Sequence, residues 1–138
     1  MRFRRGVGDG LIQVDVPIYA TSLVGTPYLW GGSAPGAGFD CSGLVSHVFA
    51  QVAGARLPRS SAEMSTVGVP LEAAQLEPGD LVFFNTQGAP FSHVGIYVGE
   101  SRFVHAANSR SGIILSRLDE PYWRERYEGA RRIEPGEQ

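Results

Sequence analysis

The chain of 138 residues contains a single cysteine and no lysine, so arginine supplies all of its basic side chains. One cysteine excludes an internal disulfide and leaves the redox compartment open, because a free thiol can exist inside or outside the cytoplasm. A formal net charge of −2 gives no basic footprint for nucleic acid. No apolar run approaches the roughly 20 residues of a membrane span. We therefore expect neither a nucleic-acid partner nor a membrane-spanning segment.

Motifs for metals and nucleotides are also missing. The three histidines, His47, His93 and His105, have no HExxH spacing, and the chain has no paired cysteines. No GxxxxGK[ST] loop and no GxGxxG fingerprint occurs, so we expect neither a metal nor another cofactor. The basic residues 1–5 are not followed by an apolar run of signal-peptide length, and we expect no export signal.

The residues that are present predict one α+β domain. Hydrophobic residues make up 43% of the chain, which is enough for a single core. The best helix covers residues 40–53, because Asp40 is a good N-cap, apolar residues recur at helical spacing and Gly54 follows. A short helix at 17–24 and a loop at 33–39 precede it. Strands are predicted at 81–84, 93–98, 102–106, 112–118 and 129–133. Helices followed by antiparallel strands favour α+β.

Cys41 follows the predicted cap directly and therefore lies in the first turn of that helix. The thiolate is the attacking form of cysteine, and the free N–H groups and dipole of a helix start lower a thiol pKa. The same N–H groups can receive the oxyanion of a tetrahedral intermediate. We predict that Cys41 is a nucleophile. The alternative is a buried structural cysteine, the commoner role of a lone cysteine on a helix.

The three histidines differ in their relation to Cys41. His47 lies six residues along the helix, about 240° around its axis, so we expect a surface or packing role. His93 and His105 flank a predicted hairpin, and if Gly99 centres the turn they stand directly opposite each other on one face. One could then take the thiol proton while the other fixes its tautomer. A slip of one residue would put them on opposite faces and leave two ordinary polar strand residues.

Six motifs follow one another along the chain: GTPYLWGG (25–32), FDCSGLV (39–45), LPRSS (57–61), PGDLVFF (78–84), HVGIYVG (93–99) and FVHA (103–106). In order and spacing they resemble the NlpC/P60 cysteine peptidases, which are papain-like cell-wall hydrolases. The resemblance covers roughly residues 16–133. It implies a single catalytic domain over 1–138, with N-terminal helices packed on an antiparallel sheet of about five to six strands.

The resemblance also implies roles for individual residues. Cys41 is the nucleophile, His93 the general base and His105 the residue that orients His93. Tyr28 falls on the family tyrosine whose hydroxyl can help to bind the oxyanion.

Other polar residues fall on positions that line the substrate cleft: Asp40, Ser42 and Ser92. Asp40 is equally a helix cap, and Ser92 is equally an ordinary loop serine. Arg59 of the LPRSS motif has either a substrate role or a structural ion pair.

The implied reaction hydrolyses an amide of peptidoglycan through a Cys-His-His thioester mechanism. The bond is either D-alanyl–diaminopimelate in a cross-link or γ-D-glutamyl–diaminopimelate within one stem. Residues 119–132 look like the Spr-type murein endopeptidases of Gram-negative bacteria, which favours the cross-link. The alternative is a papain-like acyltransferase or deamidase with another substrate.

This resemblance implies action in the bacterial periplasm, yet the sequence shows no signal peptide. Either the chain was trimmed, or a secretion system delivers it. A chain of this compact form resembles the peptidoglycan amidases that type VI secretion injects into rival bacteria, and a cognate immunity protein would then block its cleft. The other expectation is a cell-wall remodelling enzyme with peptidoglycan as its partner.

Overall fold

The computed structural model describes residues 11–34 and 38–134. Its helices and strands follow one another as η1 (Leu11–Asp15, a π-helical turn), α2 (Val16–Ser22), β1 (Ser33–Ala34), β2 (Gly38–Phe39), α3 (Cys41–Ala53), α4 (Ser61–Met64), β3 (Val69–Leu71), η2 (Ala73–Gln75, a 3₁₀ turn), β4 (Leu81–Phe84), β5 (His93–Gly99), β6 (Arg102–Asn108), β7 (Gly112–Arg117), α5 (Pro121–Arg126) and β8 (Tyr127–Arg132). The longer helices, α2 and α3, precede the strands of the antiparallel sheet, which confirms the α+β prediction.

The helix α3 begins and ends as its sequence predicts. The carboxylate of Asp40 accepts a hydrogen bond from the N–H of Gly43 at 2.7 Å, which satisfies one of the free donors at the helix start. Gly54 ends the helix in the left-handed region with φ of 63°. The earlier helix, α2, ends two residues before the predicted end because Leu23 and Val24 already donate to Ala20 and Thr21 in a turn.

Six strands form one antiparallel sheet in the order β3-β8-β4-β5-β6-β7. The central strand β4 is apolar throughout because both of its faces are buried. Leu81 and Phe83 belong to one hydrophobic cluster, and Val82 and Phe84 belong to another. Since side chains alternate between the faces of a strand, a continuous apolar run of this kind is typical of a strand covered on both sides.

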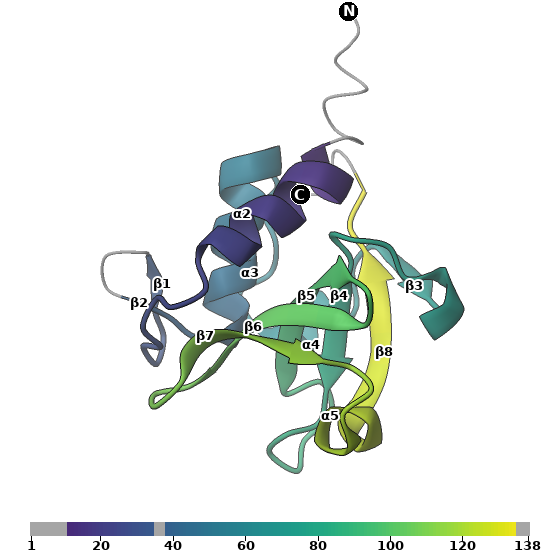
Figure 1. Cartoon of the computed structure of the whole chain (residues 1–138). Helices are drawn as coiled ribbons and strands as arrows, with labels where there is room; N and C mark the ends of the chain where they lie inside the picture. The colour runs from purple at the N-terminus through teal and green to yellow at the C-terminus, as the bar shows by residue number, and fades with distance from the viewer. Residues whose placement is uncertain (1–10, 35–37, 135–138) are drawn as a thin grey trace, which may run out of the picture.

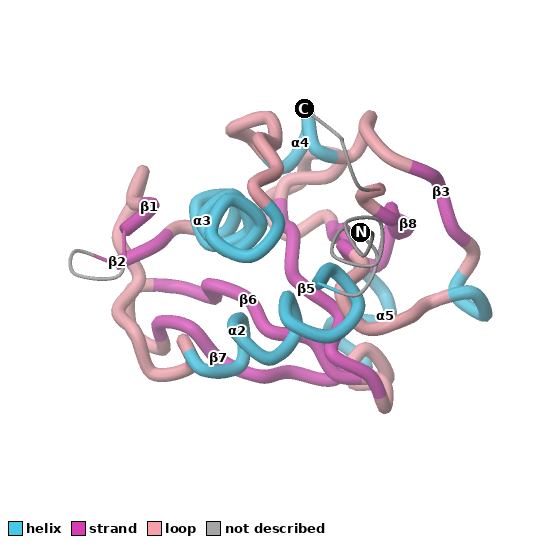
Figure 2. Tube along the Cα trace, turned by 90° about the horizontal axis from the view of Figure 1, so that it is seen from above, coloured by secondary structure: helices cyan, strands magenta, loops and turns pink. Residues whose placement is uncertain are grey.

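The two helices α2 and α3 cover the first of these faces, where apolar residues of α3 contact β5 and β6 and share one hydrophobic cluster with β4. Figure 1 shows them together at one end of the molecule, with the short helix α5 at the other end beside β8. Seen from above in Figure 2, α3 lies between the small β1–β2 ribbon and β5, as its contacts also indicate. The start of α3 is therefore held against the sheet.

The predicted register of the β5–β6 hairpin is wrong by two residues. Glu100 and Ser101 form the turn, both with positive φ, and a bulge follows between Tyr97 and Gly99. Tyr97 pairs with Phe103, and the same register places Gly95 opposite His105. Because side chains repeat every two residues along a strand, this shift keeps His93 and His105 on one face.

Four short elements are absent from the sequence prediction. The strand β3 and the turn η2 lie in a stretch left unassigned, and the two-residue strands β1 and β2 fall within the predicted loop. Residues 35–37 of that loop lie outside the described residues. Elements of two or three residues have too few positions for hydrophobic periodicity to appear.

Gly43 generates the first prediction. A Cβ at this position would overlap the carbonyl oxygen of Gly32, which accepts the N–H of Asp40 at 3.0 Å. We expect Gly43→Ala to destabilise the fold by about 1–3 kcal/mol, because overpacking forces backbone shifts. Thermal unfolding measures the effect.

Ser46→Ala on the same helix is the matched control, since the Ser46 hydroxyl is buried without a hydrogen-bond partner within the described chain. It should leave stability equal or slightly higher. Equal stability of Gly43→Ala and Ser46→Ala would contradict the close approach.

Candidate active site

Cys41 is the first residue of α3 and is partly exposed. Backbone N–H groups of Val94, Ser42 and Cys41 itself act on its thiol. Val94 follows His93 directly in β5, so the thiol lies beside the N-terminal end of that strand. The fold thus brings the predicted nucleophile next to the strand that carries the predicted base.

The expected low thiol pKa of Cys41 is wrong in direction. Burial raises the pKa of the thiol, and the negative charge of Asp40 raises it further. The N–H groups of Val94, Ser42 and Cys41 lower it, but they do not compensate for burial. At neutral pH the resting group is therefore a thiol, and a base must remove its proton before it can attack.

His93 and His105 form a buried pair. The Nε2 atom of His93 lies 2.8 Å from Nδ1 of His105, and the two rings are nearly perpendicular at 87°. This confirms the prediction that the two imidazoles share one face. His93 is 7% exposed and His105 is fully buried. With Nε2 engaged by His105, Nδ1 is the ring nitrogen of His93 that remains for another partner.

Gly95 makes the room for this pair. Its position faces His105, and a Cβ there would lie 2.7 Å from the Phe103 ring and 3.2 Å from the Cβ of His105. His93 and His105 are diagonal rather than direct neighbours, and such residues are in reach of each other only for long or aromatic side chains. A glycine between them lets the two rings meet over the strand.

Ser116 on β7 completes the chain of hydrogen bonds and was not identified from the sequence. Its Oγ lies 2.8 Å from Nε2 of His105. If His105 donates from Nε2 to Ser116, its Nδ1 must accept, and His93 must then donate from Nε2. That arrangement leaves Nδ1 of His93 unprotonated, the form in which it can take a proton. Ser116 reaches His105 because β7 pairs with β6, where Ser116 lies opposite Phe103. No local sequence pattern indicates this pairing.

Both histidines are uncharged near neutral pH. Burial lowers the pKa of His93 to about 4, against an ordinary value near 6.5. Burial, and then repulsion by His93, lower the pKa of His105 well below that value. No carboxylate contributes to either shift, so the pair differs from a His–Asp dyad, in which the negative charge favours the imidazolium.

Tyr28 lies close enough for the charges of Cys41 and Asp40 to act on its hydroxyl. Burial is the largest cause that raises the pKa of Tyr28, and these two charges add to it. The phenol therefore keeps its proton and remains a hydrogen-bond donor at neutral pH. A short bridge between Tyr28 and Phe39 ties it to the residue before Asp40.

Asp40, Ser42 and Arg59 form a connected polar group at the start of α3. Arg59 lies 3.3 Å from the carboxylate of Asp40 and donates to the Ser42 hydroxyl at 2.6 Å. Asp40 also accepts the N–H of Gly31 at 3.0 Å, beyond its role as helix cap. The ion-pair interpretation of Arg59 is thus the one that the structure displays, although the arginine side chain is still 48% exposed.

Ser92 organises the loop before β5. Its hydroxyl accepts the N–H groups of Thr86 and Gln87 at 3.0 and 3.3 Å. The neighbouring Phe91 has a positive φ of 52°, a strained conformation for a residue with a side chain. Ser61 donates to its carbonyl at 2.7 Å, and Glu128 accepts its N–H at 2.6 Å. These contacts, which the sequence did not predict, fix the backbone that leads to His93.

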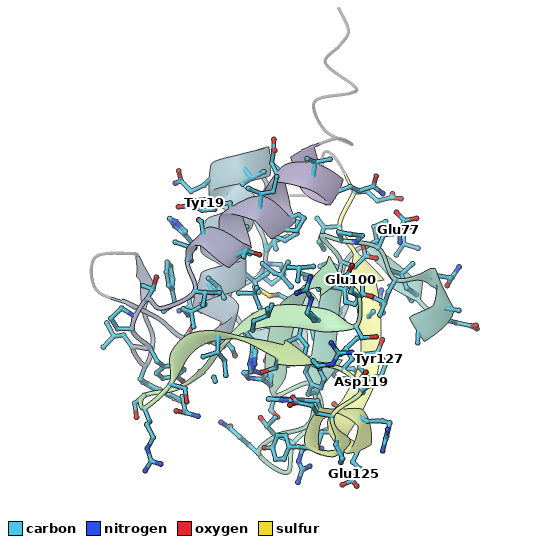
Figure 3. The ribbon with its side chains drawn as sticks, viewed as in Figure 1. Tyr19, Glu77, Glu100, Asp119, Glu125 and Tyr127 are labelled. Atoms are coloured by element: carbon cyan, nitrogen blue, oxygen red, sulfur yellow. The ribbon has the colours of Figure 1, made fainter. Side chains whose placement is uncertain are left out.

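His47 lies on α3 with Cys41, but its contacts are with Tyr19 and Phe39 and not with the histidine pair. It lies 2.8 Å from the hydroxyl of Tyr19 and packs on Phe39, as the packing role predicts. Figure 3 shows Tyr19 on α2, at the opposite end of the molecule from Glu125 of α5.

Within residues 11–34 and 38–134, no group of three or more His, Cys, Asp or Glu side chains could hold a metal ion. Over the same residues, no helix has the length and hydropathy of a membrane span.

Comparison with known proteins gives one family. The model of the NlpC/P60 family matches residues 25–132. A gamma-DL-glutamyl hydrolase of Bacillus subtilis is 44% identical over 87% of this chain and 30% of its own length. The murein DD-endopeptidase MepS/murein LD-carboxypeptidase of Escherichia coli is 46% identical over 79% of this chain and 56% of its own length. The chain thus spans about half or less of the length of these relatives.

Solved structures agree with the sequence comparisons. An NlpC/P60 family protein from Bacillus cereus superimposes with a TM-score of 0.80 at 33% identity. The match covers 88% of this chain and 40% of that protein. The sheet and helices described above are therefore those of a known papain-like domain.

The buried histidine pair generates the second prediction. Because the pKa of His93 is lower in the folded chain than in the unfolded one, the unfolded state binds a proton first as pH falls. The stabilisation is complete above pH 6.5 and is lost as pH falls towards about 4. His93 alone should cost about 3 kcal/mol of unfolding free energy across this range. Urea unfolding at several pH values measures the loss.

His93→Gln is the control, since glutamine does not titrate. Its unfolding free energy should fall less between pH 6.5 and 4 than that of the unchanged chain. The same decrease in both proteins would show that His93 is not held neutral by the fold.

Proposed function

The chain belongs to the NlpC/P60 family, and from this membership and its buried histidine pair we propose that it is a peptidoglycan endopeptidase. Cys41 is the nucleophile, His93 the general base and His105 the residue that orients His93. The observation that carries the proposal is the 2.8 Å contact between His93 Nε2 and His105 Nδ1 on the strand that meets the Cys41 thiol.

The first half of the reaction forms a thioester. Nδ1 of His93 takes the proton from the Cys41 thiol as the sulfur attacks an amide carbonyl of the substrate. The N–H of Cys41 and the hydroxyl of Tyr28 can donate hydrogen bonds to the resulting oxyanion. When the tetrahedral intermediate collapses, His93 returns the proton to the leaving amine. The carbon–nitrogen bond breaks, and the acyl group stays on the sulfur.

Water completes the second half. Nδ1 of His93 removes a proton from water, the hydroxide attacks the thioester carbonyl, and the carbon–sulfur bond breaks. The thiolate of Cys41 then recovers its proton from His93, so the enzyme ends as it began. Throughout both halves His93 keeps its Nε2 proton on the hydrogen bond to His105, so His105 and Ser116 need not change their own charge.

We propose murein as the substrate because the relative that matches at 46% is named a murein DD-endopeptidase. Cleavage would then occur at the D-alanyl–diaminopimelate bond of a cross-link, in the periplasm where murein lies. The gamma-DL-glutamyl hydrolase matches at 44%, so the γ-D-glutamyl–diaminopimelate bond is the second candidate. Both reactions use the same catalytic groups and differ in the acyl part and in the diaminopimelate amino group that leaves.

Digestion of purified murein tests the proposal. The unchanged chain should release new peptide ends, and mass spectrometry of the products identifies the bond. Cross-linked dimers that become monomers with a free D-alanine carboxyl indicate the cross-link. Peptides with a new diaminopimelate N-terminus and no loss of cross-links indicate the γ-glutamyl bond.

Cys41→Ala should reduce this digestion by roughly 10³-fold or more, because without the nucleophile only binding and the oxyanion donors remain. His47→Ala is the matched control, since His47 contacts Tyr19 and not the pair, and it should digest murein almost as fast as the unchanged chain. Undiminished digestion by Cys41→Ala would overturn the mechanism. A change of substrate mass without chain cleavage would instead point to a deamidase or acyltransferase.

A further inference from the structure

Trp123 of α5 packs directly on the histidine pair. Its ring stacks on His93 with 5.5 Å between centroids and 24° between planes. It meets His105 edge to face at 4.8 Å and 82°. The same indole contacts Phe84 at 4.9 Å and Phe103 at 5.3 Å. One side chain therefore touches both imidazoles and the aromatic residues below them.

We propose that Trp123 is a positioning residue, which closes the histidine pair from water and holds the His93 ring in the plane that its reaction requires. The effect of Trp123 on catalysis rests on the proposed function, whereas its shielding of the histidine pair from water does not. A stacked partner restricts rotation of the His93 ring, and the hydrogen bond to His105 fixes the remaining freedom.

The strands alone do not enclose the pair. Phe84 and Phe103 pack against it from β4 and β6, and His105 bonds to Ser116 on β7. Trp123 is the large side chain that α5 adds to this cluster, and it is itself only partly buried. Removal of its indole would leave a gap on the solvent side of His93 that water can enter, because the gap borders polar ring nitrogens.

The helix that carries Trp123 depends on this contact. Six residues are too few for a stable helix in water, so α5 needs tertiary packing. Within α5 the guanidinium of Arg126 lies 3.8 Å from the centroid of the Tyr122 ring, and Tyr122 packs edge to face on Trp123. Trp123 thus anchors α5 to the sheet, and α5 in turn holds the cover over the histidines.

Burial, rather than charge, sets the protonation of His93. It is the cause that lowers the pKa of His93, and for His105 the charge of His93 adds to it. The elements around the pair carry further titratable or charged groups, all at least partly exposed: Cys41 and His47 on α3, Tyr97 on β5, Arg102 on β6, Arg117 on β7, Tyr122, Arg124, Glu125 and Arg126 on α5, and Tyr127, Glu128, Arg131 and Arg132 on β8. A change in cover at Trp123 should therefore appear directly in the titration of His93.

NMR titration of the His93 ring in the full chain tests the proposal without any substrate. In Trp123→Leu the pKa of His93 should rise from about 4 towards its ordinary value of 6.5, since the leucine leaves the ring open to water. Trp123→Phe keeps a smaller ring and should show a smaller rise. Tyr122→Ala removes an aromatic side chain of the same helix without a contact to either histidine, and should leave the titration unchanged.

Kinetics on murein fragments give the second readout. If the pKa of His93 reaches 6.5, kcat/KM of Trp123→Leu should be roughly 30-fold lower at pH 5 than at pH 8, while the unchanged chain hardly varies. This decrease in kcat/KM should come from a lower kcat more than from a higher KM, because Trp123 acts on the reaction through His93.

An unchanged His93 titration in a folded Trp123→Leu variant would overturn the proposal. Thermal unfolding establishes whether the variant folds. If it does not, Trp123→Phe decides alone, and the absence of any rise there overturns it. Failure of the unchanged chain to cut murein would refute the proposed function but not the cover, because the titration needs no substrate.

Discussion

The hydrogen bond between His93 and His105 is the contact on which the rest of the site depends. It holds one imidazole in a defined orientation inside the protein, and with His105 donating to Ser116 it leaves Nδ1 of His93 unprotonated. Each neighbour contributes to that bond. Gly95 leaves the space for it, Ser116 bonds to the far nitrogen of His105, and the apolar rings of Phe84, Phe103 and Trp123 surround it. A second imidazole orients His93 without adding a buried negative charge, which would be costly unless paired.

No carboxylate contributes to the pKa of His93, and this bears on the charge state of the Cys41 thiol. A carboxylate partner would favour an imidazolium and hence a preformed thiolate–imidazolium pair. Here burial disfavours the charged form of His93 and of Cys41 alike. The helix start still matters, because its N–H groups lower the thiol pKa in part and, in the proposed mechanism, the N–H of Cys41 donates to the oxyanion. In that mechanism charge develops during the reaction rather than before it.

Much of the fold can be predicted from local patterns, because each depends on nearby residues. The cap at Asp40, the apolar run at 81–84 and the common face of His93 and His105 all follow from spacing. The hairpin register did not, since Glu100 and Ser101 adopt positive φ although neither is glycine. The pKa of Cys41, the contact of Ser116 with His105 and the packing of Trp123 depend on residues far apart in the sequence. Such contacts exist only once the sheet has formed, so no local pattern shows them.

The central claim is that Cys41 and His93 rest as an uncharged pair, and the pH dependence of thiol alkylation tests it most directly. Cys41 is the only cysteine of the chain, so the rate of reaction with iodoacetamide reports on it alone. We expect the rate to rise with pH to at least about 9, because the thiol pKa lies above its ordinary value of about 8.5. A rate that is already maximal near pH 6 would show a preformed thiolate–imidazolium pair and would contradict the account.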